Sequence, residues 1–208
     1  MISQQLRTGH VIDEKIISLF SEFPRAHFVP ENMRPFAYSD LQIPLSHHEK
    51  MMTPLEEATL LQALELQGHE TVLEVGTGTG YLTALLSRLC KKVISIDYYA
   101  DFTAQARINL DAFNCHNVEL LTGDAAMGWA DLAPYDAIIF TGSLPRLCET
   151  HQLQVLPGGQ LFALVGALNA IQGRLYRLSH EGHWEDHILF ETALPYLVHA
   201  ESKHSFIF

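Results

Sequence analysis

The chain has 208 residues, and its 48% apolar and 18% charged residues are typical of one globular domain spanning residues 1–208. Acidic residues outnumber lysines and arginines by 24 to 13, and the net charge of -11 disfavours nucleic acid and anionic membranes as partners. The sequence has no apolar run of about eighteen residues, which a membrane span requires, and no apolar signal-peptide core. We therefore expect a cytoplasmic protein.

Residues 1–70 come first and read as a helical cap, with breaks at Pro24, Pro30, Pro35 and Pro44. Short β-rich runs follow at 71–76, 92–97, 117–124, 136–142 and 159–166. Helical patterns separate them at 80–89, 100–113 and 144–153. This alternation predicts βαβ units and a parallel sheet that is covered on both faces.

The alternation stops after residue 166. The stretches "GRLYRLSH" and "WEDHILFETALPYL" read as two strands joined by a short turn, which predicts a C-terminal antiparallel hairpin within 167–208. The expected fold class is therefore α/β: a doubly wound, Rossmann-like sheet of about seven strands. Residues 71–166 form its βα nucleotide-binding core, between the N-terminal helical cap and the hairpin.

The strongest chemical signal is "VLEVGTGTGY", in which a strand ending at Glu74 leads through Gly76, Gly78 and Gly80 into a helix. Such a loop presents backbone amides and a helix N-terminus at the carboxyl edge of the sheet, where nucleotide-like ligands bind. A dinucleotide fingerprint needs its third glycine at the position of Tyr81. The GxGxG spacing instead matches S-adenosylmethionine (SAM) enzymes and opposes a nicotinamide oxidoreductase.

The next two strands also end in carboxylates. Asp97, about twenty residues beyond the loop and followed by Tyr98, suits the hydroxyls of a ribose, and Asp124 suits an adenine amino group. Taken singly, the glycines could form only a tight turn, Asp97 a strand-end cap and "GD" an ordinary turn. Together they predict a SAM site formed by Glu74, Gly76, Thr77, Gly78, Gly80, Asp97, Tyr98, Asp124 and Ala125.

Longer stretches share an order and spacing with one family: "QQLRTGHVID", "FPRAHFVP", "AYSDLQIPL", "VLEVGTGTGYLTALLSRL", "VISID", "NVELLTGD", "PYDAIIFTG" and "LPGGQLFALVG". Over about residues 3 to 197 the chain resembles the protein-L-isoaspartate O-methyltransferases. The resemblance implies a SAM-dependent protein carboxyl O-methyltransferase. Its acceptor would be the isoaspartyl carboxylate of a damaged protein or peptide, which the reaction esterifies in protein repair.

The segment 46–58, "SHHEKMMTPLEEA", departs from that family. The family pattern is approximately P-I-G-x-G-x-T-I-S-x-P, and the ungapped match places Lys50 at the threonine and Met52 at the serine usually called catalytic. Leu197 stands where the family tends to have a threonine or a similar polar residue. An isoaspartyl carboxylate is already ionised at neutral pH, so it can attack the methyl group without a general base. Catalysis then depends mostly on alignment, so these departures need not abolish activity, and we expect isoaspartyl methylation to be weak or absent.

Simpler roles are available for most residues of this segment. Thr53, Pro54 and Glu56 form a capping-box pattern, which favours Thr53 as a helix N-cap over a substitute catalytic hydroxyl. Met52 suits a pocket wall, Lys50 could attract an anionic acceptor but suits a solvated surface, and Glu57 suits a solvated helix face.

The 12 histidines and three cysteines have no metal-ligand spacing, so no metal is expected. Two functions remain open: an active SAM-dependent methyltransferase, and a SAM-binding or S-adenosylhomocysteine-binding relative that has lost isoaspartyl turnover or moved to another acceptor. The sequence does not indicate the oligomeric state.

Overall fold

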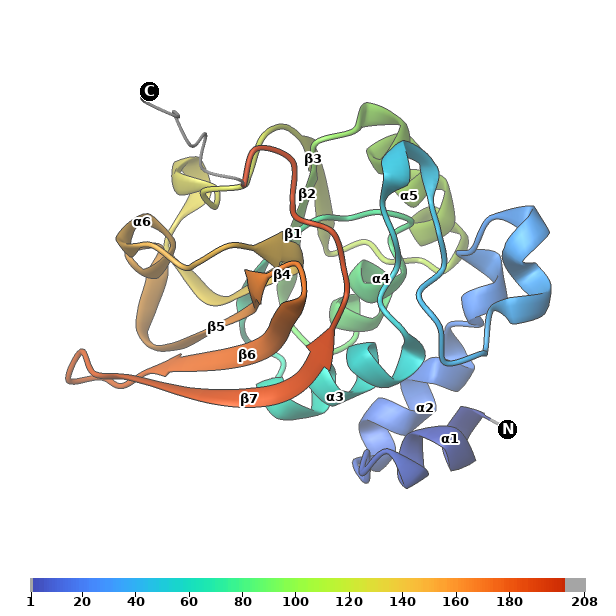
Figure 1. Ribbon diagram of the computed structural model, residues 1–208, viewed down its shortest axis with the longest axis horizontal. Coiled ribbons are helices and arrows are strands. Elements are labelled where there is room, and N and C mark those ends of the chain that lie inside the picture. Colours follow the sequence, from blue (N-terminus) through green and yellow to red (C-terminus); the bar gives the residue numbers. More distant parts are fainter. Residues whose placement is uncertain (1, 201–208) are drawn as a thin grey trace.

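The computed structural model describes residues 2–200, which form one seven-stranded sheet with the order β3-β2-β1-β4-β5-β6-β7 (Figure 1). The strands are β1 (Thr71–Val75), β2 (Lys92–Asp97), β3 (Val118–Thr122), β4 (Tyr135–Leu144), β5 (Val155–Ala167), β6 (Ala170–Leu178) and β7 (Trp184–Thr192). Strands β1 to β5 pair in parallel, whereas β6 and β7 add antiparallel to β5. The predicted α/β class and the C-terminal hairpin are confirmed.

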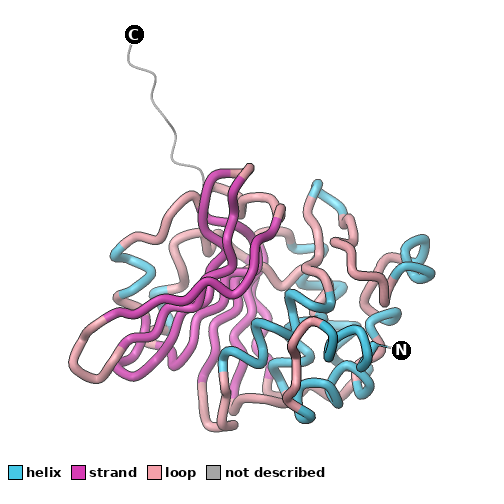
Figure 2. The backbone as a smooth tube through the Cα atoms, turned by 60° about the horizontal axis from the view of Figure 1, so that its bottom comes forward, coloured by secondary structure: helices cyan, strands magenta, loops and turns pink. Residues whose placement is uncertain are grey.

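The helices are α1 (Ile2–Thr8), α2 (Glu14–Glu22), α3 (Pro54–Leu64), α4 (Tyr81–Ser87), α5 (Ala100–Ala112) and α6 (Glu149–Gln152). Short 3-10 turns are η1 (Arg25–His27), η2 (Glu31–Phe36), η3 (Ser46–His48) and η4 (Ala130–Leu132). Helices α1 to α5 share one apolar core with one face of the sheet, and Figure 2 shows most helices gathered on that side. A second apolar core lies on the other face. Among the described residues, no helix is long and apolar enough to cross a bilayer.

The predicted helix at 144–153 is mostly wrong. Strand β4 continues to Leu144, which pairs with Val165 of β5, and only Glu149–Gln152 is helical. Ser143 also bonds to the C-terminal segment, because its amide donates to the Pro195 carbonyl at 2.8 Å. These contacts between distant segments extend the strand beyond its local pattern.

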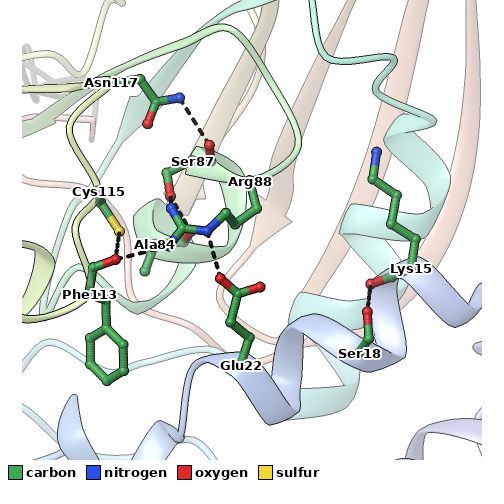
Figure 3. Close-up of polar contacts among 9 residues, drawn as sticks. All are labelled: Lys15, Ser18, Glu22, Ala84, Ser87, Arg88, Phe113, Cys115 and Asn117. Atoms are coloured by element: carbon green, nitrogen blue, oxygen red, sulfur yellow. Dashed lines mark hydrogen bonds and ion pairs between the residues drawn. The ribbon is translucent and has the colours of Figure 1, made fainter.

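The N-terminal cap is less helical than its pattern predicts, since 37–53 contains no α-helix. An ion pair joins the helical part of this cap to the sheet domain (Figure 3). Nε of Arg88, just after α4, donates to Glu22 Oε1 of α2 at 2.6 Å, and Nη2 donates to the Phe113 carbonyl at 2.9 Å. Residues 37–53, between η2 and α3, are the part of the cap that reaches the carboxyl edge of the sheet.

Candidate active site at the carboxyl edge of the sheet

The glycine loop after β1 has a backbone that few other residues could adopt. Gly76 has a φ of +100°, and a Cβ atom there would lie 2.2 Å from Oγ1 of Thr141 on β4. Gly80 has a φ of +82°, and its Cβ would lie 3.0 Å from Cβ of Ala106 on α5. Glycine is required here both for its conformation and for close packing. The loop therefore packs closely against β4 and α5.

Asp97 connects the end of β2 to this loop. Its Oδ2 accepts from the Gly78 amide at 2.7 Å and its Oδ1 from the Tyr99 amide at 3.0 Å. Burial raises the pKa of Asp97, while these two hydrogen bonds act in the opposite direction. Because each carboxylate oxygen has two lone pairs, Asp97 keeps capacity to accept from a diol.

An outer pocket lies above the strand ends. It is lined by Leu45, Glu49, Lys50, Val75, Gly76, Gly78, Ile96, Asp97, Tyr98, Tyr99, Phe102, Gly123, Asp124, Ala125, Ala126, Thr141, Gly142, Leu194, Pro195, Leu197 and Val198. Six of the nine predicted cofactor residues, from all three strand ends, thus line one cavity: Gly76, Gly78, Asp97, Tyr98, Asp124 and Ala125. Glu74 and Thr77 line the inner pocket described below, and Gly80 lines neither pocket but forms the N-cap of α4.

The C-terminal segment closes one side of the outer pocket, and of its residues only Leu197 was indicated by the sequence, through the family resemblance. Figure 1 shows the red chain after β7 running back across the sheet towards β2 and β3. His199 Nδ1 donates to Asp124 Oδ2 at 2.7 Å, and its ring lies edge-on to Tyr98 with centroids 5.3 Å apart. Asp124 also accepts from the Ala126 amide at 3.2 Å. Leu197 lies where a Cβ on Gly142 would come within 2.6 Å of it.

His47 packs against Tyr99, which lines the outer pocket. Its ring stacks on Tyr99 with centroids 3.9 Å apart and an interplanar angle of 4°. Nε2 of His47 lies 3.0 Å from Oδ2 of Asp101 at the start of α5. His47 and His48 are exposed, and the contact of His47 with Tyr99 holds η3 against the rim of the outer pocket.

An inner pocket adjoins the outer one along the glycine loop, since Gly76 and Gly78 line both. It is lined by Leu45, Lys50, Met51, Met52, Glu57, Glu74, Gly76, Thr77, Gly78, Thr79, Tyr81, Leu82 and Thr141. Oε2 of Glu74 accepts from the hydroxyls of Thr83 at 2.5 Å and Ser95 at 2.6 Å. Ser95 lies 2.6 Å from Oγ1 of Thr77 as well. Burial raises the pKa of Glu74 to about 7.

The three residues considered for catalysis have different surroundings. Lys50 is exposed and lines both pockets, so it stands at their junction. Met52 is buried in the wall of the inner pocket, and its carbonyl accepts a hydrogen bond from Arg25. Thr53 is the N-cap of α3: its Oγ1 accepts from the Glu56 amide at 3.2 Å, and its own amide donates to Glu56 Oε2 at 2.6 Å. The capping box is confirmed.

Glu57 corrects the sequence-based interpretation of a solvated helix face. Its side chain lines the inner pocket and is only 2% exposed. Oε2 of Glu57 lies 3.4 Å from Nε of Arg25, which is itself fully buried. The pattern of α3 could not reveal this, because Arg25 comes from a distant part of the chain.

Comparison with known proteins decides the family. Residues 1–193 match the family model described as protein-L-isoaspartate(D-aspartate) O-methyltransferase. The chain belongs to this family. A protein-L-isoaspartate O-methyltransferase of Pelobacter propionicus is 36% identical over 182 residues, which is 88% of this chain and 80% of the relative. One from Myxococcus xanthus is 38% identical over 160 residues, 77% of this chain and 76% of its own.

Solved structures of the family have the same fold. A protein-L-isoaspartate O-methyltransferase with 24% identity matches 94% of this chain with a TM-score of 0.75, and this chain spans 64% of that one. A Plasmodium falciparum β-aspartate methyltransferase in complex with S-adenosyl-L-homocysteine has a TM-score of 0.78 at 16% identity, covering 94% of this chain and 96% of its own. Members of the protein-L-isoaspartate O-methyltransferase family are SAM-dependent protein carboxyl methyltransferases.

The residues of this family member fit SAM. The outer and inner pockets adjoin each other, because Gly76, Gly78 and Thr141 line both. Asp97 stands at the middle of the outer pocket with acceptor capacity for ribose hydroxyls, and Glu74 has a buried oxygen, Oε1, without a hydrogen-bond partner. A ligand with a nucleoside at one end and polar groups at the other matches this arrangement.

Proposed function

We propose that the chain transfers the methyl group of SAM to the carboxylate of an isoaspartyl residue in a protein or peptide. The observation that carries this proposal is the junction of the two pockets at Gly76, Gly78 and Lys50. A donor with its nucleoside at Asp97 and its methionine end over the glycine loop has its sulfonium near this junction. We assign the donor roles to the nine residues named from the sequence, with Gly80 acting through the start of α4.

SAM supplies a methyl group on a positively charged sulfur. The neutral thioether that forms when the carbon–sulfur bond breaks is a good leaving group for nucleophilic displacement. An oxygen of the acceptor carboxylate forms a bond to the methyl carbon as the carbon–sulfur bond breaks, which yields a methyl ester and S-adenosylhomocysteine. Because the carboxylate is ionised at neutral pH, the chain needs no residue to remove a proton. Its residues act by aligning the two groups and by excluding water.

The altered residues at the junction weaken this alignment. Met52 cannot donate a hydrogen bond, and Leu197 narrows the side of the outer pocket next to Gly142. A lost positioning hydrogen bond costs about 1 to 3 kcal/mol, which corresponds to roughly tenfold to a few hundredfold in rate. Lys50 partly compensates, since its ammonium at the junction attracts an anionic acceptor.

A second candidate is a SAM-binding or S-adenosylhomocysteine-binding protein without isoaspartyl turnover, or with another acceptor. The buried thioether of Met52 favours it, because it replaces a polar group of the family pattern in the inner pocket. This candidate predicts an intact donor site without transfer to isoaspartate. In both cases we expect a cytoplasmic protein, consistent with three free cysteines among the described residues.

The deciding experiment is transfer of a radiolabelled methyl group to an isoaspartyl peptide, beside the same peptide with normal aspartate. The proposal predicts base-labile label on the isoaspartyl peptide alone, at a rate below that of a fully active family member. Calorimetry with SAM on the same preparation confirms that the donor site is intact. SAM binding without any label would favour the second candidate.

A further inference from the structure

The inner pocket is surrounded by buried polar atoms that have no hydrogen-bond partner, although two of them face each other in an ion pair. In residues 2–200, the buried side-chain atoms without a hydrogen-bond partner are Arg25 Nε, Glu57 Oε2, Glu74 Oε1 and the Tyr81 hydroxyl. Glu57, Glu74 and Tyr81 all line the inner pocket, and Arg25 contacts both Glu57 and the Tyr81 ring. Buried polar groups are seldom left unpaired, so their concentration around one cavity indicates a polar occupant.

The charges around the pocket indicate the sign of that occupant. Arg25 is fully buried and donates to the carbonyls of Met52 and Ala37, the latter at 3.1 Å, while its Nε faces Glu57. One guanidinium can balance one carboxylate, but the pocket has two, from Glu57 and Glu74. A second buried negative charge without a partner is costly, so the pocket lacks a cation when both acids are ionised.

The protonation of the two acids agrees with this count. Burial raises the pKa of Glu57 to about 8, although Arg25 lowers it. The charges of Glu56 and, to a smaller extent, Glu74 add to the rise. The pKa of Glu74 is raised to about 7, again mainly by burial. Arg25 lies behind Glu57 and does not line the pocket, whereas Lys50 does, but the Lys50 side chain is exposed and forms no ion pair within the described part of the chain.

We propose that Glu57 is a donor-binding residue of this enzyme and that, together with Glu74, it binds the α-ammonium group at the methionine end of SAM. This inference rests on the proposed use of SAM as the methyl donor. The inner pocket joins the outer one at Gly76 and Gly78, so the ammonium end of a donor with its ribose at Asp97 can reach both acids. Glu57 ionises when the ammonium enters. The guanidinium of Arg25 and the ammonium of the ligand then balance the side-chain carboxylates of Glu57 and Glu74.

Three ligands separate the amino-acid end of the donor from its sulfonium. SAM has an ammonium, an α-carboxylate and a sulfonium, S-adenosylhomocysteine has the ammonium and the α-carboxylate, and 5′-methylthioadenosine has none of these charges. Removal of an acid at residue 57 weakens the binding of an ammonium, whereas it would not weaken the binding of an α-carboxylate. In calorimetric titrations, Glu57→Gln should weaken SAM and S-adenosylhomocysteine by about tenfold or more, and methylthioadenosine by less than about twofold. Loss of SAM affinity alone would assign Glu57 to the sulfonium and overturn the proposal. Equal losses for all three ligands would overturn it as well.

Glu49 provides a matched control, because it is an acid that lines the outer pocket and not the inner one. Glu49→Gln should leave the preference for S-adenosylhomocysteine over methylthioadenosine unchanged. Lys50→Gln tests whether Lys50 is the missing cation. If Lys50 fills that role, its removal strengthens the binding of S-adenosylhomocysteine selectively, and the proposal fails.

A measurement on the wild type remains decisive if Glu57→Gln does not fold, since that variant leaves Arg25 without its carboxylate. At about pH 6.5, Glu57 and Glu74 are mostly protonated in the ligand-free protein. Binding of an ammonium next to them should release part of these protons. Titrations in buffers with different ionisation heats measure this release. It should be larger for S-adenosylhomocysteine than for methylthioadenosine, by roughly half a proton or more. Equal release contradicts the inference, whereas a wild type that binds none of the three ligands refutes the proposed donor itself.

Discussion

Asp97 Oδ2 accepts a hydrogen bond from the Gly78 amide at 2.7 Å, which holds the carboxylate at the end of β2 against the glycine loop after β1. If the ribose hydroxyls also donate to this carboxylate, Asp97→Ala should weaken SAM binding by about 1.5 to 3 kcal/mol. Asp97→Asn keeps the size of the side chain and one acceptor oxygen, so its loss should be smaller. Calorimetry on both variants tests the assignment, and unchanged affinity in Asp97→Ala would contradict it.

Gly76→Ala should abolish SAM binding or weaken it at least about tenfold, because the new Cβ would overlap Oγ1 of Thr141 and displace the loop. Gly68→Ala is the matched control. Gly68 has a similar φ of +95° but no atom within 4 Å of the added Cβ. Both variants should lose about 1 kcal/mol of stability from the backbone conformation, while only Gly76→Ala should lose the cofactor. Thermal unfolding and calorimetry separate the two effects.

Restoring the family's hydroxyl pair with Lys50→Thr and Met52→Ser should raise isoaspartyl methylation at least roughly tenfold, the effect of about 1.4 kcal/mol of transition-state alignment. Met52 is only 4% exposed, so its truncation also leaves a cavity. Lys50→Thr with Met52→Ala is therefore the control, since it makes a similar cavity without the second hydroxyl. If both double variants show the same rate, or if the wild type already matches an active relative, the segment is not an altered reaction centre.

Thr53→Ala should lower the free energy of unfolding by about 1 kcal/mol, because the Glu56 amide loses its acceptor. Thr53→Ser keeps the hydroxyl and should retain most of that stability. Urea unfolding measures both. Methyl transfer, measured well below the unfolding midpoint, should remain close to that of the wild type in both variants. A large loss of rate in folded Thr53→Ala would instead assign this hydroxyl to the reaction.

The stability of the ligand-free protein should contain a component that decreases as pH rises. Glu57 and Glu74 have pKa values of about 8 and about 7 in the folded protein, above the ordinary value of 4.5. The folded state therefore binds more protons than the unfolded state between pH 4.5 and about 8, and stability falls across this window. Glu74→Gln should flatten the slope of stability against pH, because an amide does not titrate in this range. The amide oxygen can still accept from Thr83 and Ser95, so the fold should be preserved. Urea unfolding of both proteins at several pH values would show this, and identical slopes would contradict it.

The sequence by itself determined the features that depend on neighbours along the chain. The spacing of apolar residues sets the order of strands and helices, and "VGTGTG" sets a loop that glycine alone can form next to Thr141. The capping box at Thr53 and Glu56 is similarly local. Each of these features depends on backbone geometry within a few residues, so its pattern is visible in the sequence.

Only the tertiary structure decided which charged groups are buried and what they contact. It pairs Glu57 with Arg25, brings His199 to Asp124, and extends β4 through a segment whose pattern predicts a helix. The ionisation of a carboxyl group depends on desolvation and on the charges packed around it, which come from distant parts of the chain. The α3 pattern therefore showed an acid on a helix, and the fold made that acid part of the pocket.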